Sequence, residues 1–170
     1  MRKTRSMQEE LVSFREMMMA GLVLVGFFGA GAQAAEDKNA QESAAVMSVM
    51  QTVADTWNSG KGVARDCFES SLTIVDNTPP YLFEGPRAMD DWVEAYRNGQ
   101  PKETRDAKTT LQFSPPRSVK IKSEHAYIAV PADWSVEHDG HSDVAHGIVT
   151  ASLTNRDQHW RISAWTWSPQ

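Results

Sequence analysis

Cysteine is almost absent from this chain: Cys67 is the only one among 170 residues. No disulfide can therefore form within one copy, and apolar side chains have to hold the fold together. Cys67 itself is interpreted as a small buried hydrophobe and not as a reactive thiol. Basic residues are also in the minority, with 17 Lys and Arg against 22 Asp and Glu. This balance argues against nucleic acid and anionic membrane surfaces as partners.

Long apolar runs are also lacking, and the one extended run lies near the N-terminus. Residues 17–30 are apolar, which is shorter than the roughly 20 residues that comfortably span a bilayer. Basic residues precede this run and small residues follow it, as in a secretory signal. We expect cleavage after Ala34 and export to the periplasm or the medium. The alternative is a retained N-terminal membrane anchor, and either interpretation places the functional part outside the cytoplasm.

Removing residues 1–34 leaves 13 basic and 19 acidic residues, a net charge of −6. The remaining chain is long enough for one domain with its own core and too short for two. Residues 35–43 are polar and are interpreted as a disordered leader. We therefore expect a single domain over residues 44–168, with no membrane contact beyond the signal segment.

Helices are expected in the first half of this domain. Apolar residues from Val46 to Trp57 recur every three or four positions, as on one face of an amphipathic helix that Gly60 can end. Residues 63–68 suggest a second, short helix. Pro86 suits the first position of a third helix, for which Gly99 provides an end.

Strands dominate the second half, where the sequence alternates between apolar and polar residues. After strands at 71–76 and 81–84, the pattern predicts five more, at 109–113, 117–122, 125–137, 142–155 and 159–168. Pro115-Pro116 is expected to bend the first pair of the five. Asp139-Gly140 and residues 155–157 predict hairpin turns. Helices first and antiparallel strands later indicate an α+β domain in which helices cover one face of a curved sheet.

Asp76 is the strongest chemical candidate. It follows Leu72 and Ile74 at two-residue spacing, so on a strand the three side chains share one face. A carboxylate on an apolar face is poorly hydrated and takes up a proton more readily, as a general base must. The alternative is that Asp76 caps the turn at 77–80 by accepting backbone N–H bonds, which would leave it inert.

Several segments also carry a family resemblance: 56–60 (Thr-Trp-Asn-Ser-Gly), 73–76 (Thr-Ile-Val-Asp), 83–86 (Phe-Glu-Gly-Pro), 126–128 (Ala-Tyr-Ile) and 159–165 (His-Trp-Arg-Ile-Ser-Ala-Trp). In this order and spacing they resemble the nuclear transport factor 2-like superfamily, and within it the SnoaL-like and ketosteroid isomerase-like branch. The likeness covers about residues 43–168. It is specific for the fold but not for the function, because this fold serves several kinds of enzyme as well as binding modules.

The resemblance implies a cone-shaped fold, in which a strongly curved, mainly antiparallel sheet wraps the N-terminal helices and leaves an apolar pocket open at one end. Asp76 matches the general base of the ketosteroid isomerases. Those enzymes also use a Tyr on the first helix and a protonated Asp on a later strand. Val53 stands at the first of these positions, and residues 148–150 (Ile-Val-Thr) at the second. Steroid isomerisation of that type is therefore not expected.

His146 is a candidate partner for Asp76. On the strand predicted at 142–155 it shares a face with Val144 and Ile148, so it could point into the cone and act with Asp76 as an acid/base pair. The alternatives are a histidine on the outer or subunit face, or one held by a hydrogen bond in the core.

Aromatic residues around the mouth of the cone are the candidate ligand-binding residues: Tyr81, Trp92, Tyr96 and Trp134. Each could present a hydroxyl or indole donor to a ligand, and ordinary core packing is the alternative. No cofactor and no metal ion is expected. His138, Asp139 and His141 lie at a solvated hairpin tip, and their spacing matches no established metal-ligand pattern.

The last predicted strand carries bulky residues on both of its faces: Trp160 and Ile162 on one, and Trp165 and Trp167 on the other. A strand that is apolar on both faces is covered on both faces. If helices cover one face, a second subunit can cover the other, so the sequence predicts a homodimer through the sheet.

Two functions remain open at this point. The first is an exported binding domain whose cone holds a small apolar molecule without turnover. The second is an enzyme of isomerase, dehydratase or cyclase type that uses Asp76 as a general base. The first is preferred, because only one of three expected catalytic positions is filled.

Overall fold

The computed structural model describes residues 27–170, with side chains from Glu36 onward. The predicted signal segment up to residue 26 lies outside the described residues, and cleavage after Ala34 stays a prediction. The chain divides into two compact units, Met1–Ala40 and Gln41–Gln170. Of the first unit, the structure describes only the beginning of α2 (Phe27–Asn58). No helix among the described residues is long and apolar enough to cross a membrane.

Residues 35–43 are helical in the structure, as part of α2, and the expectation of a disordered leader is corrected accordingly. The segment is polar, but it contains no Pro or Gly and is rich in Ala, Glu and Gln. These residue types have high helix propensity. Polarity alone was therefore a poor guide to its backbone conformation.

Within the second unit, α2 is the amphipathic helix that the apolar spacing predicts. It buries Val46, Met50, Val53 and Ala54 completely or almost so. The helix ends at Asn58, and Gly60 follows with a positive φ of 74°, a conformation that glycine adopts without strain. The expected short helix after it is a single 3-10 turn, η1 (Arg65–Cys67).

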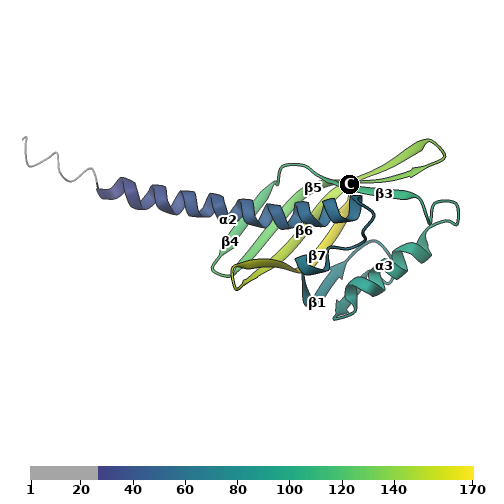
Figure 1. Cartoon of the computed structure of the whole chain (residues 1–170), viewed down its shortest axis with the longest axis horizontal. Coiled ribbons are helices and arrows are strands. Elements are labelled where there is room, and N and C mark those ends of the chain that lie inside the picture. The colour runs from purple at the N-terminus through teal and green to yellow at the C-terminus, as the bar shows by residue number, and fades with distance from the viewer. Residues whose placement is uncertain (1–26) are drawn as a thin grey trace, which may run out of the picture. The chain divides into compact units, whose positions relative to one another are not determined.

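Seven strands form one curved sheet with the order β2-β1-β7-β6-β5-β3, and β4 also pairs with β5. All neighbours are antiparallel except β1 and β7, which are parallel. Figure 1 shows α2 lying across this sheet and α3 (Ala88–Gly99) beside β1. The strands are β1 (Phe68–Val75), β2 (Leu82–Gly85), β3 (Lys108–Phe113), β4 (Ser118–Lys122), β5 (His125–His138), β6 (His141–Arg156) and β7 (His159–Pro169).

The predicted hairpin turn at Asp139-Gly140 is confirmed, whereas the second turn lies at residues 157–158 and not at 155–157. His138 pairs with His141 across Asp139-Gly140, and both turn residues have positive φ, as a two-residue hairpin with matched twist requires. Pro115-Pro116 has a different role from the one expected. Strands β3 and β4 do not pair with each other but lie along the same edge of β5, and the prolines connect them, because they cannot donate to a ladder.

A β-bulge in β7 changes which side chains face inward. Ser152 pairs with Ala164 while Leu153 pairs with Ile162, so Ser163 is one extra residue in β7. One extra residue shifts the alternation of the strand by one position. Ile162 on one side of the bulge and Trp165 on the other therefore both contact the core. The expectation that β7 carries bulk on both faces is wrong, and this support for a dimer falls away.

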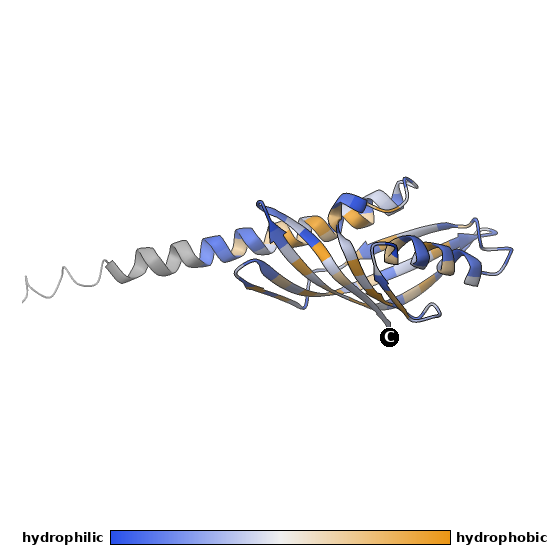
Figure 2. Ribbon diagram, turned by 90° about the horizontal axis from the view of Figure 1, so that it is seen from below, coloured by the Kyte–Doolittle hydropathy of each residue, from blue (hydrophilic) through white to orange (hydrophobic). Residues whose placement is uncertain are grey.

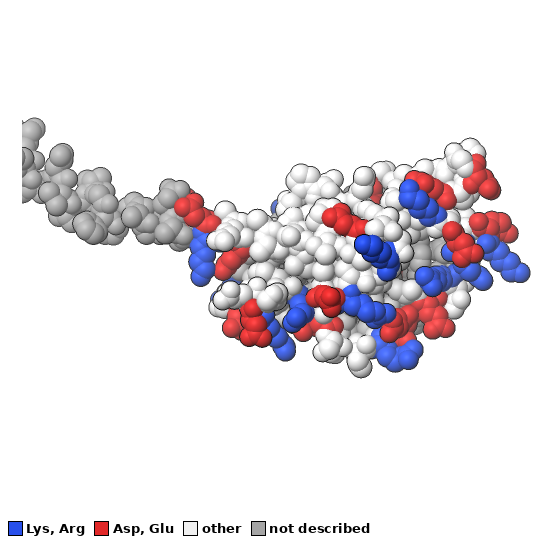
Figure 3. All heavy atoms as spheres, in the orientation of Figure 1, with Lys and Arg blue, Asp and Glu red and all other residues white. Residues whose placement is uncertain are grey.

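The core lies between α2 and the inner face of the sheet, where Figure 2 shows apolar residues on both. Charged residues are interspersed over the face seen in Figure 3. Their ion pairs, such as Arg87–Asp91 at 3.1 Å and Lys108–Glu137 at 3.4 Å, are exposed. Exposed pairs contribute at most about 1 kcal/mol each, so core packing dominates the stability of the fold.

Asn58 connects the end of α2 to the edge of the sheet. Its side-chain amide donates to the carbonyl of Leu111 at 2.8 Å and accepts from the Leu111 N–H at 2.7 Å. Trp57 donates its indole N–H to Thr109 Oγ1 at 2.8 Å. These bonds complete the outer edge of β3 as a neighbouring strand would, and fix α2 against it.

We predict that Asn58→Asp lowers the free energy of unfolding by about 2 kcal/mol, because a carboxylate cannot donate to the Leu111 carbonyl and places two acceptors against each other. Urea denaturation followed by circular dichroism measures this change. Asn39→Asp, at an exposed position of α2, is the matched control and should change the value by a few tenths of a kcal/mol. An equal effect of both variants would contradict the role assigned to Asn58.

Candidate functional site

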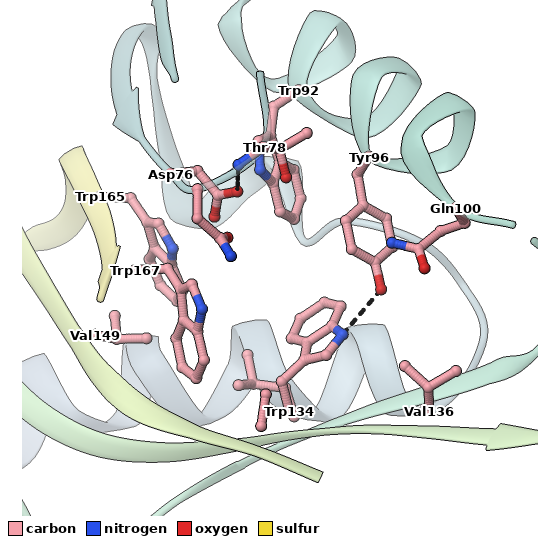
Figure 4. Close-up of a pocket in the computed structure, with 13 residues that line it drawn as sticks. Asp76, Thr78, Trp92, Tyr96, Gln100, Trp134, Val136, Val149, Trp165 and Trp167 are labelled. Carbon is pink, nitrogen blue, oxygen red and sulfur yellow. Dashed lines mark hydrogen bonds between the residues drawn. The ribbon is translucent and has the colours of Figure 1, made fainter. Parts of the chain in front are cut away.

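A cavity of about 200 Å³ lies at one end of the second unit, between the inner face of the sheet, α3 and the turn after β1. Figure 4 shows its walls: five of the 13 lining residues are aromatic, and one carries a carboxylate. The residues that line it are Asp76, Asn77, Thr78, Trp92, Tyr96, Gln100, Leu111, Trp134, Val136, Ala145, Val149, Trp165 and Trp167.

Asp76 stands where the alternation of β1 predicts. Leu72 and Ile74 are 4% and 1% exposed, and Asp76 is the one buried charged residue among the described residues, at 9%. Its Oδ1 accepts the backbone N–H of Thr78 at 2.8 Å. The turn-capping role and the pocket position, which the sequence presents as alternatives, occur together: one oxygen caps the turn while the carboxylate lines the cavity.

Tyr96 from α3 and Trp134 from β5 point toward each other at the cavity wall (Figure 4). The Trp134 indole N–H donates to the Tyr96 hydroxyl oxygen at 2.9 Å. An indole N–H can only donate, so the phenol oxygen is the acceptor and its own proton is free to donate to another group. Such a chain of donors polarises the phenol and strengthens the bond that it can give to a ligand.

Tyr96 and Trp134 belong to a group of four aromatic rings, with Trp57 and Trp92 as the other two. The centroid separations are 5.0 Å for Trp57–Trp134, 5.5 Å for Tyr96–Trp134, 5.8 Å for Trp92–Tyr96 and 6.0 Å for Trp57–Trp92. Each ring thus contacts two others in a closed circuit. Contacts at these separations stabilise by about 0.5–1.5 kcal/mol each beyond the burial of area. The circuit restricts the rotamers of Tyr96 and Trp134, and a ligand meets a preformed wall.

The pKa of Tyr96 is raised above its ordinary value of 10.0, first because the ring is buried and also because the Asp76 charge lies nearby. The hydrogen bond from Trp134 acts in the opposite direction. Burial disfavours the phenolate, and the neighbouring carboxylate repels it. Tyr96 therefore remains a neutral donor at any physiological pH, and its phenol and the Asp76 carboxylate interact within the same site.

Trp165 and Trp167 complete the wall on the side of β7, and the sequence interpretation does not name them as site residues. The bulge at Ser163 brings them inward. Gly147 permits the position of Trp167: a Cβ at residue 147 would lie 2.6 Å from Trp167 Cη2 and 2.7 Å from the Ser168 carbonyl oxygen. Any larger residue would displace the indole and the β7 backbone. In the sequence, the bulky apolar residues of this strand stand at even positions up to Ile162 and at odd positions from Trp165 onward. Such a change is typical of a bulge and could have revealed it.

Two of the predicted site residues are not in the cavity. His146 lies on the outer face of β6, where its Nδ1 contacts Asp133 Oδ1 at 2.8 Å and its side chain is 69% exposed. The candidate role of His146 as a partner of Asp76 is therefore corrected in favour of the outer-face alternative, because residues of odd number on β6, such as Val149 and Ala151, face the core. Tyr81 is 59% exposed in the turn before β2. Its φ of 75° is in the left-handed region and the structure places its side chain outside the cavity lining.

Trp92, Tyr96 and Trp134 line the cavity as predicted. The Trp92 indole nitrogen is buried and has no hydrogen-bond partner among the described residues. An unpaired buried donor costs about 1–3 kcal/mol. Gln100, Asn77 and Thr78 add polar atoms that sequence reasoning does not find, since they follow the ends of elements and show no periodicity.

The described residues contain no group of three or more His, Cys, Asp or Glu that could hold a metal ion. At the hairpin tip, His138 Nε2 instead contacts Asp143 Oδ2 at 2.9 Å.

Comparison with known proteins places this geometry in a fold class. No protein-family model matches the chain, and no curated protein matches it in sequence. Solved structures match clearly. An NTF2-like protein with a cystatin-like fold from Novosphingobium aromaticivorans has a TM-score of 0.66 and 11% identity, over 85% of this chain and 92% of its own.

Two further structures are similar to a comparable degree. A protein of unknown function from Mycobacterium tuberculosis has a TM-score of 0.65 and 14% identity, covering 85% of this chain and 78% of its own. A candidate scytalone dehydratase from Novosphingobium aromaticivorans has a TM-score of 0.64 and 12% identity, covering 79% and 88%. The chain has the cone-shaped NTF2-like fold, and the prediction of fold class is confirmed. At these identities the likeness establishes the fold and no particular activity.

The opposite effects of Asp76 and Trp134 on Tyr96 provide a test of the site geometry. We predict that Asp76→Asn lowers the pKa of Tyr96 and that Trp134→Phe raises it, because the first removes a repelling charge and the second removes a bond that favours the phenolate. Ultraviolet difference spectroscopy measures tyrosinate directly. Tyr81→Phe and Tyr127→Phe in the background leave Tyr96 as the only one of the 3 tyrosines.

The free energy of unfolding should depend on pH through the same Tyr96 phenol. The folded-state pKa of Tyr96 lies above the ordinary value of 10.0, so the unfolded chain ionises first. The contribution of the neutral phenol is fully present below pH 10.0 and is lost as the pH rises through the folded-state pKa. If Asp76→Asn and Trp134→Phe shifted the pKa of Tyr96 in the same direction and by the same amount, that result would contradict the arrangement in Figure 4.

Proposed function

We propose that this chain is an exported binding domain of NTF2-like fold that holds one small, largely apolar molecule in the aromatic cavity beside Asp76. The single observation that supports this most strongly is the preformed cavity itself. Its aromatic walls are held in a circuit of ring contacts, and a few polar groups converge on it. Apolar walls with a few placed polar groups are typical of small-molecule sites.

We also propose a homodimer through the outer face of the sheet. Both described α-helices contribute side chains to the inner side, and among the described residues no helix covers the outer side. Tyr127 is 44% exposed there, next to the small or apolar residues Ala129 and Pro131. An apolar area on an open sheet is a common site of protein association.

Native mass spectrometry of the protein purified from its own host tests the binding proposal. We expect the mass of the protein plus one retained small molecule. Ala145→Phe should lose it, because a benzyl group at a residue that lines the cavity occupies the space of the ligand. Ala45→Phe, at an exposed position of α2, is the matched control and should retain the molecule.

The same spectra report the oligomeric state, and the dimer proposal expects twice the chain mass. A monomer that retains the molecule would contradict the dimer and leave the binding proposal standing. If neither the parent protein nor Ala45→Phe carries a molecule or takes one up, the binding proposal is wrong.

A second candidate function is an enzyme, and one observation favours it: Asp76 and the free phenol proton of Tyr96 face the same cavity. For an enolisable ketone, Asp76 would take a proton from the carbon next to the carbonyl. The electron pair would move to the carbonyl oxygen, which the Tyr96 hydroxyl would stabilise. The proton would then return to carbon.

We predict that, if this chemistry occurs, the protein exchanges deuterium from solvent into the α-position of a cyclic ketone, and NMR measures the rate. Asp76→Asn should slow the exchange by about 10²–10⁴-fold and Tyr96→Phe by about 10²–10³-fold. Asp133→Asn, on the outer face beside His146, is the control and should have no effect. No exchange above the buffer rate would rule out this candidate.

A further inference from the structure

Asp76 is the only charged residue that lines the cavity. No Lys, Arg or His of the described residues forms an ion pair with it, and its one hydrogen-bond donor among them is the backbone N–H of Thr78. A single neutral donor compensates a buried carboxylate only in part. The site therefore holds a negative charge, 9% exposed, for which the protein itself supplies no positive partner.

The walls around this carboxylate are aromatic to an unusual extent. Five rings, from α3, β5 and β7, surround the space in front of Asp76 in Figure 4: Trp92, Tyr96, Trp134, Trp165 and Trp167. The face of an aromatic ring carries negative electrostatic potential, and Trp attracts a cation most strongly. Rings and carboxylate thus favour the same charge, whereas a neutral apolar ligand would need neither Asp76 nor so many tryptophans.

The hydrogen-bonding groups set a second condition on the ligand. The Trp134 indole N–H is already bonded to the Tyr96 oxygen, and the Asp76 carboxylate in the lining would repel an anion. The Tyr96 hydroxyl and the side chains of Asn77, Thr78 and Gln100 can hydrogen-bond a polar part of the ligand. A volume of about 200 Å³ is below the range of about 300–1,000 Å³ that is usual for drug-sized ligands, so the ligand is small.

We infer that the molecule held in this cavity is a small organic cation, a substituted ammonium group on an apolar body, with Asp76 as its counterion and the aromatic rings as its cage. This inference rests on the proposed binding function and adds the class of ligand. The alkylated ammonium group is weakly hydrated, so it loses less on entering an apolar cavity than a primary ammonium does.

A pair of probes of equal shape and different charge tests the inference: phenyltrimethylammonium and its neutral isostere tert-butylbenzene. Quenching of tryptophan fluorescence measures both affinities in the full chain. We expect the cation to bind about tenfold tighter or more. Asp76→Asn should reduce this ratio severalfold, since the amide keeps an oxygen that accepts the Thr78 N–H but carries no charge, and the rings alone retain a smaller preference for the cation.

Two further variants distinguish the effect of the Asp76 charge from a general effect on folding. Asp133→Asn, a carboxylate on the outer face, should keep the ratio of the parent protein. Trp167→Leu leaves Asp76 in place and removes one ring of the cage, and it should weaken the cation more than the neutral probe. Circular dichroism confirms that each variant is folded.

The outcomes distinguish a failure of the cation inference from a failure of the proposed binding function. Equal affinities of the two probes, or a preference for the cation that Asp76→Asn leaves unchanged, would overturn the cation inference while the binding function stands. Binding of neither probe by a protein that retains another molecule in native mass spectrometry would do the same. Binding of neither probe together with no retained molecule would overturn both.

Discussion

One extra residue in the last strand determines the character of the site. Ser163 has no partner in the β6–β7 ladder, and its hydroxyl donates to the carbonyl of the facing Ser152 at 3.1 Å. The bulge shifts the alternation of β7 by one position. Because of this shift, Ile162 packs in the core and Trp165 and Trp167 still face inward. Without it the two indoles would point to the outer face, and the cavity would lose one wall.

The position of Trp167 depends in turn on the lack of a side chain at Gly147. Its ring lies so close to the β6 backbone that even a Cβ would overlap with it. A side chain at residue 147 would displace this indole, which lines the cavity, and would thereby change the space in front of Asp76. The cavity therefore exists because a large residue on one strand is matched by the smallest residue on the next.

Much of this structure was predictable from the sequence. The boundaries of the strands, the hairpin turn at Asp139-Gly140 and the burial of Asp76 with Leu72 and Ile74 all follow from local rules, namely alternation and turn chemistry. Trp92, Tyr96 and Trp134 were predictable too, because each lies on a regular element whose apolar face has to meet the core. Local rules suffice wherever the alternation of a strand or helix is unbroken.

The gaps in the sequence interpretation have physical reasons. The tryptophans of β7 were not named as site residues, because one extra residue in a strand changes the face of every residue after it. The inner or outer position of His146 was left open. The prediction for Tyr81 was wrong for another reason: this residue lies in a turn with positive φ, where neither helical nor strand periodicity applies. Periodicity gives relative faces along a strand. Only the contacts between strands decide which of these faces is the inner one.

Asp76 also decides how the two candidate functions relate to each other. A general base must be ionised when the substrate arrives and must then accept a proton from it. A counterion must stay ionised throughout, and a cation held beside it stabilises that ionised form and so weakens the carboxylate as a base. An aromatic cage that concentrates positive charge in front of Asp76 therefore acts against proton abstraction at the same place. The more strongly the five rings favour a cation, the less the site is suited to enolisation, and the arrangement of this cavity favours binding over turnover.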